Sequence, residues 1–204
     1  THAEMERCLK AWEASDRLTL HEYARSHEGR PLYYVVITSP ENHARLASIR
    51  EAVGKLADPR LLASDDEADA LVARTPAIAW MAYNIHGDEI SSTDAALAVI
   101  YRLIAGMGDD VRETLSELVI VVDPLMNPDG RDRYLAQLRE FDGYVPSLDA
   151  RAMQHEGRWP FGRGNHYLFD LNRDFMLGVH PESVGRQRAI SQWHPQLLVD
   201  SHEM

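Results

Sequence analysis

The segment NIHGDEISS (residues 84–92) places a histidine and two acids directly after a run of apolar residues. His86 and Glu89 are three positions apart, so at the start of a helix their side chains would lie on one side and could share a metal ion. Imidazole nitrogen and carboxylate oxygen both suit Zn²⁺, and a catalytic zinc usually has three protein ligands and a water. His202, which ends the apolar segment PQLLVDSH, is the best-placed third ligand.

The same pair also has an ordinary structural explanation. Glu89 would be favourable in the first turn of a helix whatever its function, and His86 could simply cap that helix. The placement of the pair is what favours a metal. Three predicted strands end in turns rich in reactive side chains, at residues 86–89, 127–130 and 200–203.

Hydrophobic patterning indicates the elements that must position these residues. It predicts strands over residues 17–26, 30–39, 77–85 and 195–202, and a further strand within 117–130 that runs into a turn. Helices are predicted over 39–53, 91–106 and 181–194, with 57–76 as a surface connection. Buried strands that alternate with helices predict an α/β fold with a largely parallel sheet, in which function collects at the carboxyl ends of the strands.

Composition narrows the class of protein. The chain has 204 residues, of which 45% are hydrophobic and 26% charged, as in an ordinary globular domain. A net charge of -11 argues against binding to nucleic acids or anionic membranes. The single cysteine, Cys8, excludes an internal disulfide and a thiolate zinc cluster. No apolar run approaches the ~18 residues that a membrane span needs. The chain begins at Thr1, so we expect that a preceding segment was removed.

Four motifs occur in the order and context of the zinc carboxypeptidase family: NIHGDEIS, MNPDGRDR, FDLNRDF and VDSHE. The chain resembles this family from about LTLHEYARS to its last residue. The resemblance implies a three-layer αβα fold with a mixed, largely parallel sheet, in which residues 1–204 form a single catalytic domain. It also implies one Zn²⁺ per chain, bound by His86, Glu89 and His202.

The resemblance assigns further residues around the metal. Asp170 would receive the second ring N–H of His86 and so orient that ligand. Asn172 and Arg173 would grip the C-terminal carboxylate of a peptide, because a planar guanidinium pairs with a carboxylate through two hydrogen bonds.

The family also places an arginine where it polarises the scissile carbonyl and stabilises the oxyanion. Arg163 is the choice here, because it precedes Asn-Arg in an Arg-x-Asn context like that of the family; the alternatives are Arg158, Arg131 and Arg133. NPDGRDR itself is interpreted as structural, with Pro-Asp-Gly as a tight turn at a strand end.

The match stops after the third zinc ligand. The general base of the family is a glutamate well downstream of that ligand, and the substrate-capping tyrosine also lies downstream. Neither position exists before Met204, so we expect a fragment of a longer enzyme whose sheet is incomplete at the C-terminus. Glu203 is a poor substitute for the base, because adjacent residues of a strand point to opposite faces.

The leading hypothesis is a zinc-dependent metallocarboxypeptidase that hydrolyses the C-terminal peptide bond of peptides with a zinc-activated water. The alternatives are a zinc-dependent deacylase of N-acyl amino acids, a non-catalytic module that binds peptide C-termini, and a metal-free α/β domain with coincidental motifs. We also expect a monomer, and, because family members are most often exported, a secreted or periplasmic location. The preferred terminal side chain of the substrate stays open.

Overall fold

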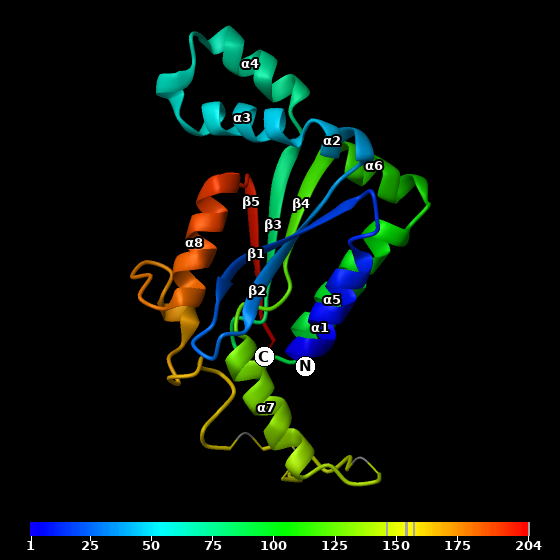
Figure 1. Ribbon diagram of the computed structural model, residues 1–204, viewed down its shortest axis with the longest axis vertical. Helices are drawn as coiled ribbons and strands as arrows, with labels where there is room; N and C mark the ends of the chain where they lie inside the picture. Colours follow the sequence, from blue (N-terminus) through cyan, green and yellow to red (C-terminus); the bar gives the residue numbers. More distant parts are fainter. Residues whose placement is uncertain (146, 154, 157, 204) are drawn as a thin grey trace.

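A five-stranded mixed sheet forms the centre of the protein, which a computed structural model describes over residues 1–145, 147–153, 155–156 and 158–203 (Figure 1). The spatial order of the strands is β1-β2-β4-β3-β5. Their bounds are β1 (Leu18–Arg25), β2 (Pro31–Ile37), β3 (Ala77–Tyr83), β4 (Leu118–Asp123) and β5 (Leu197–Ser201). β2 pairs antiparallel with β1 and β4, whereas β3 pairs parallel with β4 and β5. Only β2 therefore runs against the others, and the carboxyl ends of β3, β4 and β5 meet at one edge.

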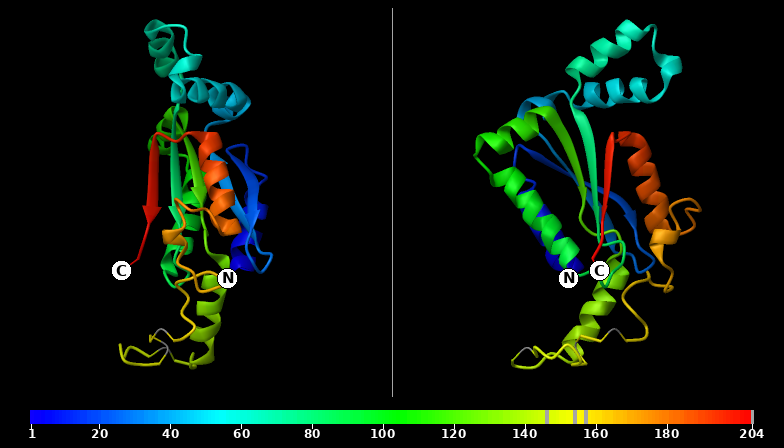
Figure 2. Two further views of the ribbon diagram at one scale, coloured as in Figure 1. Left: turned by 90° about the vertical axis from the view of Figure 1, so that its left-hand side faces the viewer. Right: turned by 180° about the vertical axis from the view of Figure 1, so that it is seen from behind.

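Helices cover both faces of this sheet (Figure 2). One face carries α1 (His2–Trp12), α5 (Ser91–Ala105) and α6 (Asp109–Glu117), and the other carries α3 (Leu46–Ala57) and α8 (Pro181–Trp193). The remaining helices are α2 (Pro40–Ala44), α4 (Asp65–Arg74) and α7 (Pro128–Glu140), with short 3₁₀ turns η1 (Pro59–Leu61) and η2 (Leu171–Arg173). The predicted α/β fold class, with three layers and a largely parallel sheet, is confirmed.

The side-chain alternation of the strands divides the core in two. In β2, Val35 and Ile37 pack toward α5 and α6, whereas Tyr34 and Val36 pack toward α8. Every one of these side chains is buried because both faces are covered, and this is why the strands read as continuous apolar runs. Trp193 of α8 also donates a hydrogen bond from Nε1 to the hydroxyl of Tyr34 at 3.2 Å, which fixes α8 on the sheet.

Four helical segments differ from the sequence predictions. The predicted helix over 39–53 is divided at Arg45 into α2 and α3. The predicted surface connection over 57–76 contains α4, which begins at the N-cap Ser64 with three acids in its first turn. Helices α1 and α6 were not predicted. In α6 only Val111 and Leu115 are buried, so its apolar stripe is too short to give a clear helical period.

The interpretation of Pro-Asp-Gly as a tight turn is wrong. Pro128 is the first residue of α7, and the side chain of Asn127 caps the helix by accepting a hydrogen bond from the backbone N–H of Gly130 at 3.0 Å. Proline suits the first helical position because the N–H that it lacks has no partner there. The motif therefore begins a helix that projects from the carboxyl end of the sheet (Figure 1).

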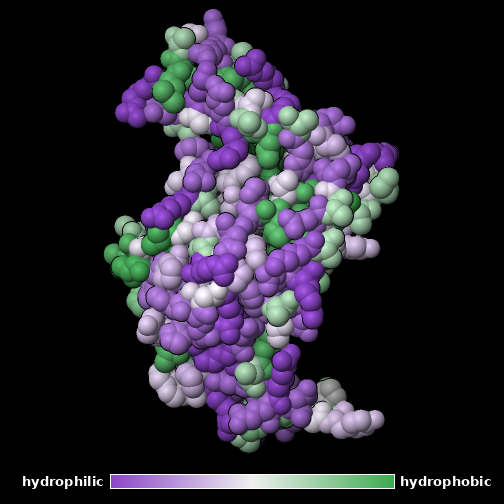
Figure 3. Space-filling model, viewed as in Figure 1, coloured by the Kyte–Doolittle hydropathy of each residue, from purple (hydrophilic) through white to green (hydrophobic). Residues whose placement is uncertain are grey.

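The surface carries both hydrophilic and hydrophobic side chains. The face in Figure 3 is largely hydrophilic, with apolar side chains in scattered groups. In the described part of the chain, no helix combines the length and the apolar character that crossing a membrane requires.

Asp123, the last residue of β4, is a fully buried acid. One carboxylate oxygen accepts a hydrogen bond from the hydroxyl of Tyr23 at 2.8 Å, and the other makes no hydrogen bond of ordinary geometry with the described residues. Burial raises the pKa of Asp123 to about 7, although the Tyr23 hydroxyl and the charge of Arg186 act in the opposite direction.

This buried acid predicts a pH dependence of stability. Between about pH 4 and pH 7 the unfolded chain releases a proton that folded Asp123 retains, so the free energy of unfolding should fall as the pH rises through this window. The asparagine of Asp123→Asn cannot ionise. From pH 4 to pH 7 the free energy of unfolding of this variant should therefore fall by up to about 4 kcal/mol less than that of the wild type. Urea unfolding of metal-free protein at pH 4 and pH 7.5 measures this difference. Equal pH slopes for wild type, Asp123→Asn and the exposed-site control Asp65→Asn would contradict the prediction.

Candidate metal centre

The three predicted metal ligands lie together at the carboxyl edge of the sheet. In the parallel pair of β3 and β5, Tyr83 is opposite Ser201, so the loop after β3 lies beside His202. One ligand atom each from His86, Glu89 and His202 can be chosen so that all three lie within 4.8 Å of one another. His86 and Glu89 are buried, whereas the side chain of His202 is 31% exposed. The cluster is therefore open to solvent on one side.

Both imidazole rings turn the same nitrogen toward Glu89. Nδ1 of His86 is 2.6 Å from Oε1 of Glu89, and Nδ1 of His202 is 3.3 Å from Oε2. The outer nitrogens face other carboxylates: Nε2 of His86 is 3.0 Å from Asp170, and Nε2 of His202 is 3.1 Å from Asp200. Zinc-binding histidines commonly hold their second ring nitrogen against a carboxylate in this way.

These residues fit Zn²⁺. Two imidazole nitrogens and a carboxylate make a three-ligand set that leaves one position for water. Oε2 of Glu89 is buried, and its 3.3 Å contact with Nδ1 of His202 lacks hydrogen-bond geometry, so a cation would satisfy it. Burial disfavours the charged ring of His202, but the carboxylates of Asp200 and Glu89 outweigh this effect and raise its pKa. The cluster therefore attracts positive charge.

Asn84 shapes the loop that carries two of the ligands. Its backbone has a φ of 59°, a left-handed conformation that asparagine tolerates better than most residues. Its side-chain amide donates to the carbonyls of His86 at 2.6 Å and Glu89 at 2.8 Å, and its Oδ1 accepts from Thr93 at 3.0 Å. Sequence reasoning did not assign Asn84 a role, although an asparagine directly after a buried strand was an available signal.

The MNPDGRDR motif joins this loop to the loop of Arg163. Asn127 donates from Nδ2 to the carbonyls of Ile85 and Arg163, both at 3.1 Å. The buried guanidinium of Arg131 donates to the carbonyl of Ile90 at 2.6 Å and to Oδ1 of Asn84 at 3.2 Å. These contacts support the structural interpretation of the motif.

The alternative arginines are engaged elsewhere. Arg131 lies inside the loop described above, and Arg133 donates to the carbonyls of Phe161 and Gly164. Arg158 stacks over the ring of Phe141 at 4.1 Å. Of the four arginines considered for the metal centre, these three are thus committed to structural contacts.

Asp170 connects Arg163 to the metal cluster. Its Oδ1 faces His86 and also accepts from the backbone N–H of Asn172 at 2.9 Å, and its Oδ2 is 3.2 Å from the guanidinium of Arg163. Arg163 is 49% exposed and lines a pocket of about 150 Å³ together with Asp170 and Trp159. A larger apolar pocket of about 500 Å³ lies beside Ala77, at the opposite end of β3, and has no part in this site.

Asn172 and Arg173 lie in η2, directly after Asp170. Arg173 is exposed, and its guanidinium donates to the carbonyl of Asn172 at 3.1 Å. No ion pair to Arg173 occurs within the residues that the structure describes. The structure thus places the guanidinium of Arg173, which forms no ion pair with the described residues, close in sequence to Asp170, the carboxylate that faces His86.

The close packing around Gly87 leaves no room for a side chain at this position. A Cβ at this position would overlap the backbone of Gly130 and Arg131 and lie 2.5 Å from the carbonyl oxygen of Gly162. Gly87→Ala should therefore displace the ligand loop, destabilise the protein by about 2–4 kcal/mol and weaken zinc binding at least tenfold. Urea unfolding and competition with a chromogenic zinc chelator measure both effects. The control is Gly54→Ala in α3, where a Cβ meets nothing within 4 Å. Equal zinc affinity in the two variants would contradict the account.

The family pattern described as zinc carboxypeptidase (peptidase family M14) matches residues 5–195. No curated protein sequence gives a significant match. Among solved structures, the metallo-carboxypeptidase from Burkholderia cenocepacia is similar with a TM-score of 0.64 and 17% identity, over 99% of this chain and 40% of that one. The carboxypeptidase A from Helicoverpa armigera gives a TM-score of 0.54 and 15% identity, over 99% of this chain and 44% of that one.

The structural likeness shows that the fold is shared, and the chain spans less than half the length of these solved proteins. The family pattern is matched by the sequence itself over nearly the whole chain. The chain belongs to the zinc carboxypeptidase family.

Proposed function

We propose that the protein is part of a zinc-dependent metallocarboxypeptidase, which releases the last residue of a peptide. The observation that carries this proposal is the cluster of His86, Glu89 and His202, in which each outer imidazole nitrogen faces a carboxylate. Membership of a family of zinc metalloproteases supports the same class of reaction.

Bound zinc would supply a coordinated water with a pKa near 7 and would polarise the scissile carbonyl as a Lewis acid. The residues of this chain prepare the site for that ion. Asp170 and Asp200 accept hydrogen bonds from the Nε2–H groups of His86 and His202, and this tautomer leaves each Nδ1 lone pair free for the metal. Glu89 supplies the anionic ligand.

Arg173 and Asn172 would bind the substrate carboxylate. A guanidinium that forms no ion pair with the described residues can pair with an incoming carboxylate without first breaking a salt bridge. Such a clamp fixes the free end of the peptide, so the bond presented to the metal is the last one. This geometry favours removal of one residue at a time over internal cleavage.

Arg163 would stabilise negative charge on the scissile carbonyl oxygen. Its guanidinium contacts Asp170, which itself contacts His86, and half of its side chain is exposed toward solvent. A hydrogen-bond donor held at this position can stabilise the negative charge that develops on the carbonyl oxygen in the transition state.

None of the site residues named so far is proposed as the proton acceptor for the attacking water. Glu203 accepts hydrogen bonds from the backbone N–H of Ser91 at 3.1 Å and from its hydroxyl at 2.8 Å, so its carboxylate is already engaged at the start of α5. The solved relatives are more than twice as long as this chain, and the remainder of such a domain is the proposed source of the base.

The carboxylate clamp predicts a specific kinetic defect. In the complete enzyme, Arg173→Met should lower kcat/KM for a peptide with a free C-terminal carboxylate by about 10–100-fold, the value of a lost charged hydrogen bond. The matched control is Arg188→Met, which removes an exposed arginine from α8. Release of the terminal amino acid measures both variants.

The same assay separates the competing functions. A peptide whose C-terminus is a carboxamide should resist hydrolysis, and equal turnover of the carboxamide would contradict the clamp. Hydrolysis of N-acyl amino acids but not of peptides would favour a deacylase, and carboxylate-dependent binding without turnover would favour a binding module. The secreted or periplasmic location and the monomeric state remain predictions.

A further inference from the structure

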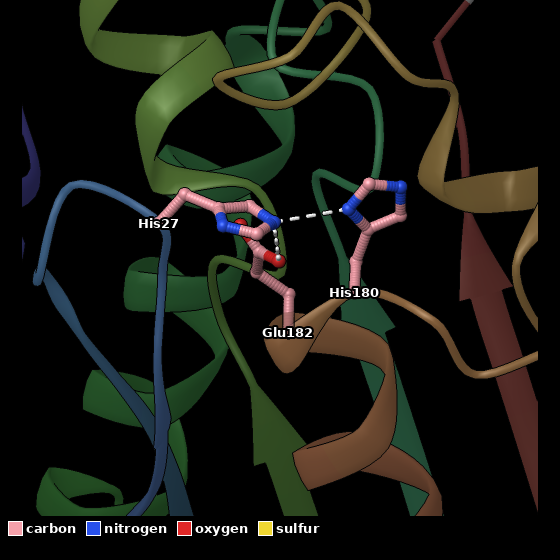
Figure 4. A group of neighbouring side chains, drawn as sticks. All are labelled: His27, His180 and Glu182. Carbon is pink, nitrogen blue, oxygen red and sulfur yellow. Dashed lines mark hydrogen bonds and ion pairs between the residues drawn. The ribbon is translucent and has the colours of Figure 1, made fainter.

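A second group of side chains that could hold a metal ion shares no residue with the first. His27 lies in the turn between β1 and β2, His180 is the N-cap of α8, and Glu182 is in the first turn of that helix. One ligand atom from each lies within 4.8 Å of the others. Nε2 of His27 is 3.0 Å from Nδ1 of His180 and 4.0 Å from Oε2 of Glu182 (Figure 4).

We propose that His27, His180 and Glu182 form a second metal site, which binds a divalent cation of zinc-like preference. Two imidazole nitrogens and one carboxylate are again a zinc ligand set with a position left for water. The site would join the β1–β2 turn to the start of α8.

The carboxylate of Glu182 is the strongest observation for this site. Its side chain is 1% exposed, and neither oxygen makes a hydrogen bond of ordinary geometry with the described residues. Burial raises its pKa, and the charge of His27 and nearby backbone N–H groups offset this only in part. A buried carboxylate without a strong partner is costly, and a bound cation would remove that cost.

No fixed side-chain cation serves Glu182 among the described residues. Arg186, four residues further along α8, is buried too, but it forms no ion pair with Glu182 among the described residues. His27 lies at the limit of ion-pair distance and is charged only when protonated. The carboxylate therefore lies beside two imidazole rings (Figure 4), and among the described residues its one ion-pair contact is with His27.

The contacts of Asn165 fix one ring nitrogen as a lone-pair donor. Oδ1 of Asn165 accepts from the backbone N–H groups of Tyr167 and Phe169, so its Nδ2 must face Nδ1 of His180, which is 3.1 Å away. Nδ1 of His180 is consequently an acceptor in the metal-free protein. Nε2 of His27 approaches the same lone pair, and a cation between the rings would replace this crowded arrangement and release the Asn165 contact.

A hydrogen bond between the two rings is the simpler alternative. It accounts for the 3.0 Å distance between His27 and His180, but it leaves the buried carboxylate of Glu182 without a partner. The metal accounts for all three side chains.

Metal stoichiometry tests the proposal. Chelator-stripped protein is loaded with excess Zn²⁺, freed of unbound metal by gel filtration, and measured by elemental analysis. Wild type should hold about two zinc ions per chain, whereas His27→Ala, Glu182→Gln and His86→Ala should each hold about one. His166→Ala is the matched control, since this histidine neighbours His27 but pairs with Glu28, and it should keep both ions.

Circular dichroism shows whether each variant is folded, and we expect His27→Ala to fold because His27 lies on an exposed turn. The proposal is overturned if His27→Ala and Glu182→Gln retain the wild-type metal content. That result is independent of the first site, because His86→Ala alone reports on the proposed catalytic zinc. Loss of an ion in His86→Ala but in neither of the other two would support the catalytic zinc only.

Discussion

The parallel pairing of β3 with both β4 and β5 is the constraint on which the site depends. Its register sets Ala82 opposite Asp123 on one side, and Tyr83 opposite Ser201 on the other. Three chain segments far apart in sequence therefore leave the sheet at one edge. Any slip in register would move the loop after β3 away from residue 202, and the two histidines would no longer share a carboxylate.

A buried polar network gives that edge its rigidity. Asn84, Asn127 and Arg131 are all buried, and their side chains bond mainly to backbone carbonyls of the loops that carry functional residues. Because these loops contain few regular backbone hydrogen bonds, the side chains supply the partners that secondary structure would otherwise provide. The loop that carries His86 and Glu89, two of the proposed ligands, is thus held by side chains that are not themselves ligands, and Gly87 allows its backbone to approach that of Gly130 closely.

Local patterning was enough to predict the buried strands and the α/β class, because both depend on short-range signals, whereas the three layers and the complete ligand set were implied by the resemblance to the family. The role of Asn84 was not predictable in the same way, because it depends on which carbonyls lie near a left-handed turn. Pro128–Gly130 satisfied the sequence signals of a turn and of a helix start equally well, and the cap by Asn127 decided between them. The pairing of His27 with His180 joins residues 153 positions apart, which no spacing in the sequence indicates.

Anomalous diffraction at the zinc absorption edge, from crystals of the zinc-loaded protein, tests the central claim most directly. The account predicts a peak bonded to Nδ1 of His86, Nδ1 of His202 and the carboxylate of Glu89 at about 2.0–2.2 Å. Asp170 and Asp200 should still contact the outer ring nitrogens. The account is contradicted if no anomalous peak lies among these three residues while both rings remain hydrogen-bonded to Glu89.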